Sequence, residues 1–141
     1  MTEALLPQVM ADTHAAAFTQ SRPWSAAEFT ALLESPLNFA IGDARAFALV
    51  RVVAQEAELL TIATAPAHRR RGLARATMAG WAAEARRRGA LEAFLEVAED
   101  NMPAQALYHA CGFALCGRRS GYYPREGRAA ADALLMRAYL R

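Results

Sequence analysis

Apolar residues in the opening segment of the chain recur three or four positions apart, which is the period of an amphipathic helix. The residues at this spacing are Leu5, Val9, Thr13 and Ala16. A second helix opens at Ser25, because Ser25 and Glu28 have the spacing of a capping box, and it runs to about Glu34. The sequence therefore predicts two helices before Pro36.

The pattern then changes to short apolar runs bounded by polar turns, which is typical of strands. Three such runs lie at residues 37–41, 46–53 and 58–64. Polar residues at 42–45 and at Gln55-Glu56 separate them. This arrangement predicts a three-stranded antiparallel meander.

Helical spacing returns over residues 74–88, and Gly89 supplies the residue after the C-cap. A strand is predicted over residues 91–97. Asn101 then caps a short helix that has Pro103 in its first turn and Gly112 just past its end. Two final strands are predicted near residues 113–122 and 132–139.

The predicted order of elements is ααβββαβαββ. A strand, a helix and a strand in succession place residues 58–64 beside residues 91–97 as a parallel pair, while the other neighbouring strands run antiparallel. The fold class is therefore α/β (α+β), with a mixed, mostly antiparallel sheet and flanking helices. No repeat or break in composition divides the chain, so we expect residues 1–141 to form a single domain.

The composition argues against several classes of function. All 16 basic residues are arginine, so Schiff-base catalysis by lysine is excluded, and a net charge of +2 is too small to argue for nucleic-acid binding. Cys111 and Cys116 do not have the spacing of a redox or zinc pair, and the three histidines are scattered, so no metal site is expected. The pattern predicts neither a signal peptide nor a membrane-spanning segment, and we expect a cytoplasmic protein.

Residues 69–74 read Arg-Arg-Arg-Gly-Leu-Ala and lie between a predicted strand and a predicted helix. Free backbone N–H groups at a helix start, together with the helix dipole, form a site for phosphate. Gly72 stands where a side chain would crowd a pyrophosphate, and arginine forks suit phosphate oxygens. The alternative interpretation is a basic surface turn.

The spacing Arg69-x-x-Gly72-x-Ala74 resembles the Gln/Arg-x-x-Gly-x-Gly/Ala loop with which the Gcn5-related N-acetyltransferases (GNAT family) hold the pyrophosphate of acetyl-coenzyme A. A second stretch is similar to the acetyltransferases that modify protein N-termini, in particular the bacterial ribosomal-protein-alanine type. It consists of Leu95-Glu96-Val97, Asn101, Ala104, Tyr108 and Gly112-Phe113. Further matches are Pro23-Trp24-Ser25 and the run Arg118-Arg119-Ser120-Gly121-Tyr122-Tyr123-Pro124, so the resemblance covers nearly the whole chain.

The resemblance implies a GNAT fold, in which the central parallel strands splay apart and the pantetheine arm lies between them like an extra strand. It implies a cofactor site for acetyl-coenzyme A made by Ile62, Ala63, Thr64, Arg70, Arg71, Gly72, Leu73, Ala74, Arg75 and Asn101. Asn101 keeps its role as a helix cap beside a contact to the pantetheine arm. Little room remains before the first helix for the opening strand of related acetyltransferases, so we expect that strand to be absent or very short.

The resemblance also assigns two catalytic residues. Glu96 corresponds to the general base for the incoming ammonium, and an α-amino group, with a pKa of ~7.7–8.0, is within reach of a carboxylate base. Tyr108 corresponds to the group that assists the departing thiolate, by hydrogen bonding rather than by complete proton transfer. The alternatives are a solvated or ion-paired carboxylate and a core tyrosine. Helical periodicity places Tyr108 off the apolar stripe, which it assigns to Pro103, Ala106, Leu107 and Ala110.

The function implied is direct transfer of acetyl from acetyl-coenzyme A to the N-terminal α-amine of a protein, the alanine of a small-subunit ribosomal protein. Its partner would be an N-terminal peptide, with no membrane or nucleic acid involved. Tyr122 and Tyr123 are candidates for lining the acceptor groove, Trp24 is assigned to packing, and Asp100 adds negative charge near the peptide entrance. The alternatives are acetylation of a small amine, a noncatalytic acyl-coenzyme A-binding module and an arginine-rich module that docks on RNA.

Overall fold

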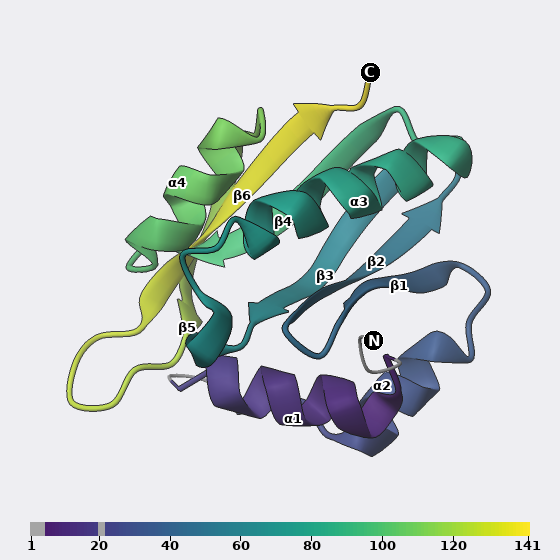
Figure 1. Ribbon diagram of the computed structural model, residues 1–141. Helices are drawn as coiled ribbons and strands as arrows, with labels where there is room; N and C mark the ends of the chain where they lie inside the picture. The colour runs from purple at the N-terminus through teal and green to yellow at the C-terminus, as the bar shows by residue number, and fades with distance from the viewer. Residues whose placement is uncertain (1–4, 20–21) are drawn as a thin grey trace.

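The computed structural model describes residues 5–19 and 22–141. Its elements follow the predicted order, with one added 3-10 turn, η1 (Figure 1). They are α1 (Pro7–Ala17), α2 (Ala26–Leu33), β1 (Asn38–Asp43), β2 (Ala46–Val53), β3 (Glu56–Thr64), η1 (Pro66–His68), α3 (Leu73–Arg87), β4 (Glu92–Ala98), α4 (Met102–Ala110), β5 (Ala114–Tyr123) and β6 (Ala131–Tyr139). The predicted capping box is present, with Ser25 and Glu28 each accepting from the other's backbone N–H.

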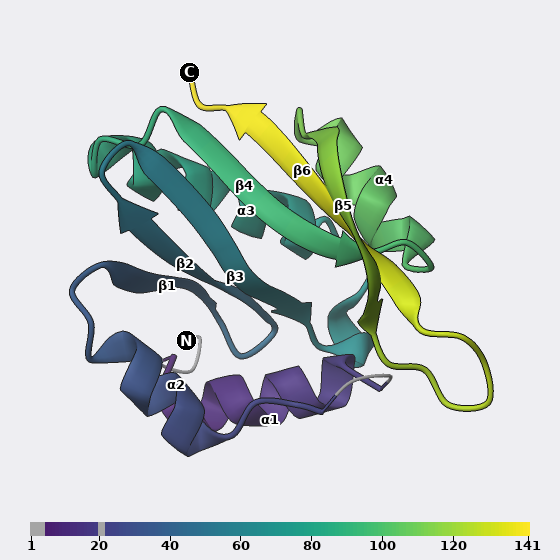
Figure 2. The ribbon, with the colours of Figure 1, turned by 180° about the vertical axis from the view of Figure 1, so that it is seen from behind.

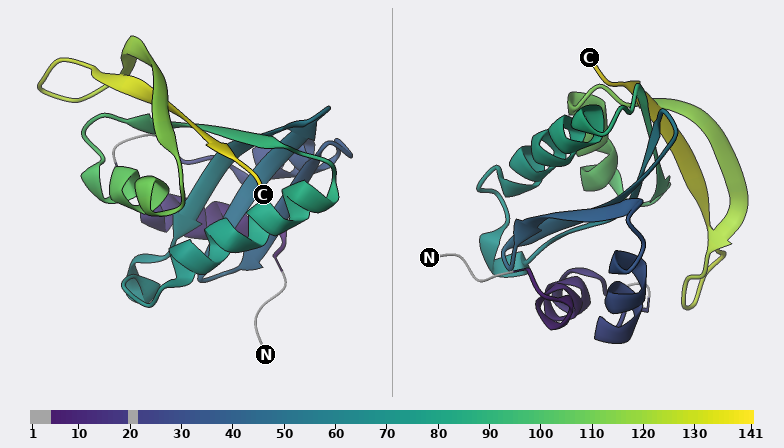
Figure 3. Two further views of the ribbon diagram at one scale, coloured as in Figure 1. Left: turned by 90° about the horizontal axis from the view of Figure 1, so that it is seen from above. Right: turned by 90° about the vertical axis from the view of Figure 1, so that its right-hand side faces the viewer.

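The strands form a six-stranded sheet in the order β1-β2-β3-β4-β6-β5. The pair β3 and β4 is parallel, and the other neighbours in the sheet are antiparallel, as predicted. Helices α3 and α4 cover one face, and α1 and α2 lie against the other (Figure 3). Seen from behind, α1 and α2 lie under the β1 to β3 side, and no helix lies in front of β4, β6 and β5 (Figure 2). One half of the sheet is therefore open on this face.

A core on each side of the sheet fixes the helices. The larger core joins Trp81 and Met78 of α3 to Ala93, Leu95 and Val97 of β4. The smaller core joins α1 and α2 to β2 and β3 through Met10, Phe29, Phe47, Leu49 and Ala63. Strand β2 contributes to both cores, which is why residues 46–50 are all buried.

The central strands separate soon after they meet. Parallel pairing joins Glu56–Glu58 to Glu92–Phe94 and then stops, although β3 runs on to Thr64 and β4 to Ala98. On the other edge of β3, the pairing with β2 skips Leu60, so a β-bulge lies two residues beyond the last parallel pair. A bulge bends its strand. We call the resulting gap between residues 59–64 and 95–98 the wedge.

His14 of α1 forms a hydrogen bond to Thr61 of β3, an interaction that the sequence did not predict. Its ring is 3% exposed and stacks between Phe18 and Trp24, with ring centroids 4.2 and 5.2 Å away. The backbone N–H of Trp24 donates to Nδ1, so a neutral ring carries its proton on Nε2 and donates it to Oγ1 of Thr61, 3.2 Å away. Burial lowers the pKa of His14 to about 4, which keeps the ring neutral at neutral pH.

The described residues test only part of the expectation that an opening strand is absent or very short. Leu5 and Leu6 are not in a strand, and an opening strand within residues 1–4 lies outside the described residues. Strand β1 forms the edge of the described sheet on that side. Among residues 5–19 and 22–141, no helix is long and apolar enough to cross a membrane.

Candidate functional site

The arginine-rich loop joins β3 to α3 as predicted, and helix α3 begins one residue earlier, at Leu73. Arg70 and Gly72 both have left-handed backbones, with φ of 64° and 74°. Gly72 is the N-cap and provides no side-chain cap, and the N–H of Ala76 makes the bond to its carbonyl. The N–H groups of residues 73–75 therefore have no partner within the helix and point out from its positive end.

Glycine at position 72 has a backbone reason in addition to the predicted one. A Cβ built there has no atom of the described residues within 4 Å, so the described part of the protein does not crowd this position. The positive φ is what favours glycine, and the open space beside it is free for a ligand.

The arginines of the loop have different surroundings. Arg69 donates to the carbonyl of Ala17 at 3.4 Å, and Nη1 of Arg71 lies 3.2 Å from Nδ1 of His68. The exposed Arg70 side chain makes no hydrogen bond or ion pair with any residue that the structure describes. Arg75 is exposed in the first turn of α3 and lies near enough to Cys111 to offset part of the rise that burial causes in the pKa of that thiol.

The backbone of β3 presents polar groups to the wedge. The N–H of Ala65 bonds to the carbonyl of Arg45, on the β2 side. Because backbone groups alternate in direction along an antiparallel strand, Ile62 and Thr64 direct theirs toward the wedge, and Ala63 directs its own toward β2. Three predicted cofactor residues thus lie together at the wedge, and two of them have free backbone groups there.

Helix α4 begins beside the wedge, at Asn101, whose Oδ1 accepts from the N–H of Ala104 at 3.2 Å as a helix cap. The predicted apolar stripe of this helix is wrong, because Pro103, Ala106 and Ala110 are exposed. Tyr108 is instead the buried residue of the helix, 5% exposed and in edge contact with Phe113. A large aromatic ring gains far more from burial than alanine or proline, so it decides which face packs.

The hydroxyl of Tyr108 is nevertheless reachable. It makes no hydrogen bond with any described residue, and no buried side-chain oxygen in the described part of the chain lacks a partner. The oxygen of this hydroxyl is therefore not completely buried. Burial of the ring raises the pKa of Tyr108 well above its usual range, so the hydroxyl is a hydrogen-bond donor rather than a source of free protons.

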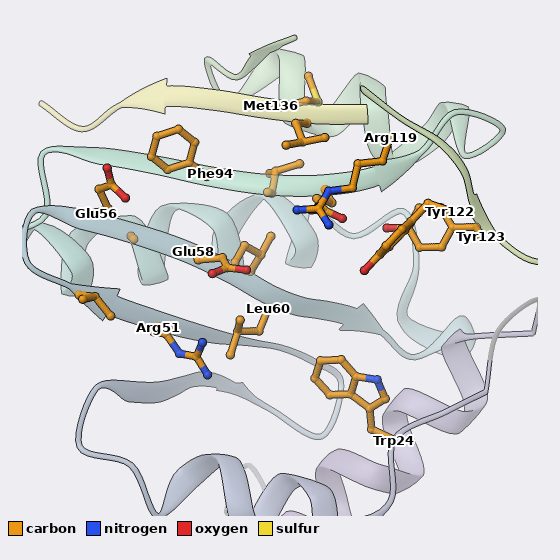
Figure 4. A pocket seen from close by; sticks show the side chains of 16 residues that line it. Trp24, Arg51, Glu56, Glu58, Leu60, Phe94, Arg119, Tyr122, Tyr123 and Met136 are labelled. Atoms are coloured by element: carbon orange, nitrogen blue, oxygen red, sulfur yellow. The ribbon is translucent and has the colours of Figure 1, made fainter. Parts of the chain in front are cut away.

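A groove of about 700 Å³ lies on the open face of the sheet (Figure 4). Trp24, just before α2, lines the groove on one side, Tyr122 and Tyr123 of β5 line it on another, and Glu58 and Leu60 of β3 lie nearer its middle. The groove is also lined by Arg51, Val53, Glu56, Ala57, Leu59, Phe94, Leu95, Glu96, Arg119, Leu135 and Met136. The two tyrosines thus line a groove as the sequence suggested, and Trp24, which was assigned to packing, lines it as well.

Glu96 is the predicted site residue that reaches this groove. Its side chain is 29% exposed, and Oε1 lies 3.2 Å from Nε of Arg119, an ion pair that the sequence did not predict. Tyr123 lies within electrostatic reach of both Glu96 and Tyr108. Burial, with a smaller contribution from Glu96, raises the pKa of Tyr123 to about 12. Tyr123 therefore lies near both of the predicted catalytic residues.

Asp100 does not add free negative charge to the groove, contrary to the sequence prediction. Two nitrogens of Arg125 donate to its two oxygens at 2.8 and 3.0 Å, and Arg128 donates at 2.8 Å. These bonds, with that of Arg125 first, lower the pKa of Asp100 to about 2. Asp100 instead ties the β5–β6 hairpin to the start of α4.

This arrangement suits an acyl transfer in which two substrates arrive from different sides. An anionic cofactor fits the free N–H groups of α3, and its extended arm fits the backbone groups at the wedge. An amine in the groove meets a carboxylate at the wedge. No group of histidine, cysteine and acidic residues within the described ranges could hold a metal ion.

Comparison with known proteins agrees with this geometry. A model described as "Acetyltransferase (GNAT) family" matches residues 8–113. The chain is 40% identical to the [ribosomal protein bS18]-alanine N-acetyltransferase of Escherichia coli (strain K12) over 119 residues, which are 81% of this chain and 79% of that protein. It is 39% identical to the streptothricin acetyltransferase of Streptomyces lavendulae over 97 residues, 67% of this chain and 51% of that one. The crystal structure of the ribosomal-protein-S18-alanine N-acetyltransferase from Escherichia coli superposes with a TM-score of 0.85 at 30% identity, covering 95% of this chain and 87% of that one.

Proposed function

The chain belongs to the acetyltransferase (GNAT) family and is an acetyl-coenzyme A-dependent N-acetyltransferase, and from this premise we propose that its acceptor is the N-terminal α-amine of a protein, the alanine of a small-subunit ribosomal protein. The observation that carries the proposal is the open groove that Glu96 helps to line, in a chain 40% identical to an enzyme named for that reaction. An extended peptide fits such a groove, because aromatic walls and strand edges bind a backbone with little regard to side chains.

The proposed cofactor site follows the loop and the wedge. The N–H groups of Leu73, Ala74 and Arg75 bind the pyrophosphate, next to the open space at Gly72. Arg70 and Arg71 add positive charge at the same place. The backbone groups of Ile62 and Thr64, together with the side chain of Asn101, bind the pantetheine arm along the wedge.

In the proposed reaction, Glu96 accepts a proton from the acceptor ammonium, directly or through water. The neutral nitrogen then attacks the thioester carbonyl carbon, so a C–N bond forms as the C–S bond breaks, and the nitrogen loses its second proton. The coenzyme A thiolate leaves with the electron pair and takes up that second proton, while the proton on Glu96 passes to solvent. An acid or base placed in this way contributes roughly 10²- to 10⁴-fold in rate.

Tyr108 is proposed to act on the sulfur side. Its hydroxyl has no partner among the described residues and is not completely buried, so it is free to donate a hydrogen bond to the developing thiolate. The raised pKa of Tyr108 argues against complete proton transfer to a thiolate whose conjugate acid has a pKa near ~8.5. Cys111 is half-buried with a raised pKa, which favours direct transfer over a cysteine-bound intermediate.

Acetylation of a small amine is the second candidate, and the 39% identity to a streptothricin acetyltransferase favours it. The two functions share the cofactor site and differ in the acceptor. The family match favours an enzyme over a noncatalytic acyl-coenzyme A-binding module or a module that docks on RNA.

Mass spectrometry of the products distinguishes the two acceptors. The protein and acetyl-coenzyme A are incubated with the N-terminal hexapeptide of ribosomal protein bS18, with the same peptide carrying a blocked α-amine, and with streptothricin. The proposal predicts one added acetyl group on the first peptide alone. Acetylation of streptothricin without acetylation of the peptide would overturn it.

A further inference from the structure

The acceptor groove contains an arginine that the proposed reaction does not use. Arg119 lies on β5, and Glu96 lies two strands away on β4, with β6 between them. The Arg119 side chain reaches across β6 into the groove (Figure 4), and its Nε lies 3.2 Å from Oε1 of Glu96. Its guanidinium carbon is also 5.4 Å from the centre of the Tyr122 ring. Two contacts therefore hold this cation beside the proposed base.

The pair has a consequence for charge in the groove. A lone carboxylate attracts an ammonium ion and so binds the unreactive form of an amine more tightly than the reactive, neutral form. By linkage, any such preference raises the pKa of the bound amine by the logarithm of the affinity ratio. A guanidinium in contact with the carboxylate cancels most of this attraction while leaving Oε2 of Glu96 available.

We propose that Arg119 is a specificity-determining residue that cancels the charge of Glu96 in the acceptor groove, so that the enzyme binds the ammonium and the neutral amine about equally well. The inference rests on the proposed function, in which an acceptor amine meets Glu96. Its effect is to preserve the neutral fraction of the bound amine near neutral pH, where a free α-amine, with a pKa of ~7.7–8.0, is already partly neutral.

The other charged and titratable groups that face this pair are Glu56 and Glu58 of β3, Arg51 of β2, and Tyr122 and Tyr123 of β5. Arg51 bonds to Oδ1 of Asn38 at 3.2 Å and so is held toward β1. Burial raises the pKa of Tyr123 to about 12, so its phenol carries no charge near neutral pH. Glu56 and Glu58 are present in every variant, so a comparison between variants removes their contribution.

Arg118 is a matched control. It is the next residue along β5 and carries the same charge, but it does not line the groove, because it bonds to Glu99 at 2.8 Å and to Asp132 at 2.9 Å. Its replacement by glutamine removes one positive charge and one ion-pair partner from the same strand, without changing the surroundings of Glu96.

The test is calorimetry of the protein saturated with coenzyme A, which cannot donate acetyl. Two probes are titrated at pH 6.5: the bS18 hexapeptide and its des-amino analogue, in which hydrogen replaces the N-terminal amine. The ratio of the two dissociation constants measures the preference for the ammonium. Arg119→Gln should raise this preference roughly three- to tenfold, as expected for charges about 6 Å apart in a partly solvated groove. The increase should vanish near pH 9, where the amine is neutral.

Three further variants show whether the effect of Arg119→Gln comes from the charge beside Glu96. Arg119→Lys keeps the charge and should restore the wild-type ratio, Arg118→Gln should leave the ratio unchanged, and Glu96→Gln should shift it toward the des-amino peptide. If both peptides bind and Arg119→Gln matches the wild type, the inference is wrong and the proposed acceptor stands. If the wild type binds neither peptide, the proposed acceptor and the inference both fail. An Arg118→Gln shift as large as that of Arg119→Gln would also overturn the inference.

Discussion

Gly72 and Gly89 stand at opposite ends of α3 in the same kind of backbone conformation. Their φ angles are 74° and 94°, and a Cβ at either position would have no atom of residues 5–19 and 22–141 within 4 Å. A side chain at either position is therefore strained by about 1–2 kcal/mol without a clash inside the protein. They differ in that Gly72 borders the proposed pyrophosphate site.

The first prediction uses this match. Gly72→Glu should abolish binding of coenzyme A, because it places a carboxylate where the pyrophosphate binds, beside the free N–H groups of α3. Gly89→Glu adds the same charge and similar strain and should lower stability about equally while leaving affinity unchanged. Calorimetry with coenzyme A measures the affinity of both variants. Equal affinities in the two folded variants would mean that the cofactor binds elsewhere.

The second prediction concerns Arg70, which makes no polar contact with the described residues. Arg70→Gln should weaken coenzyme A binding, and the loss should be larger at about 0.02 M salt than at about 0.5 M, because salt screens an exposed charge. Arg86→Gln removes the same charge from the last turn of α3 and should change affinity little at either salt concentration. Identical losses of affinity in the two variants would mean that Arg70 attracts the anionic cofactor only at long range, as any arginine on α3 does.

The third prediction is a pH dependence of stability. The pKa of His14 is about 4 in the folded protein and ~6.5 in the unfolded chain, so the unfolded state binds the proton first as the pH falls. The stabilisation is complete above pH 6.5 and is lost by about pH 4, to a total of about 3 kcal/mol. Urea unfolding at a series of pH values measures it. His14→Gln should be less stable and should lose this slope, whereas exposed His109→Gln should retain it.

The fourth prediction separates catalysis from packing at Tyr108. Tyr108→Phe keeps the ring that packs on Phe113 and removes only a hydroxyl without a partner among the described residues. Its free energy of unfolding should change by less than about 0.5 kcal/mol, while kcat falls by roughly 10²-fold, as for the loss of one donor to a developing anion. A variant that loses stability but keeps its rate would make Tyr108 a core residue alone.

Local rules predicted most of the fold from the sequence. The Ser25 capping box, the meander and the turn at Gly72 each depend on residues close together in the chain, and each is present. The parallel pair followed from element order alone. Strand β3 begins at Glu56, which was assigned to a turn, because the hairpin closes tightly at Ala54, with a φ of 54°.

The features that the sequence did not predict are those made by distant residues or by packing. His14 meets Thr61 across 47 positions of the chain, and Arg119 meets Glu96 across an intervening strand. The stripe assigned to α4 failed because periodicity weights alanine and proline like larger residues, whereas the burial of Tyr108 decides the face that packs. No local pattern marks the bulge at Leu60.

The rate of Glu96→Gln as a function of pH tests the account most directly, with acetyl transfer to the bS18 hexapeptide as the assay. The substitution keeps the shape of the side chain and removes the base, so kcat/KM should fall roughly 10²- to 10⁴-fold near neutral pH, while acetyl-coenzyme A affinity stays nearly unchanged. The deficit should shrink above pH ~8, where the α-amine is already deprotonated, and Tyr108→Phe should show no such recovery. A Glu96→Gln profile parallel to that of the wild type, or a fully active variant, would contradict the assignment of Glu96 as the base.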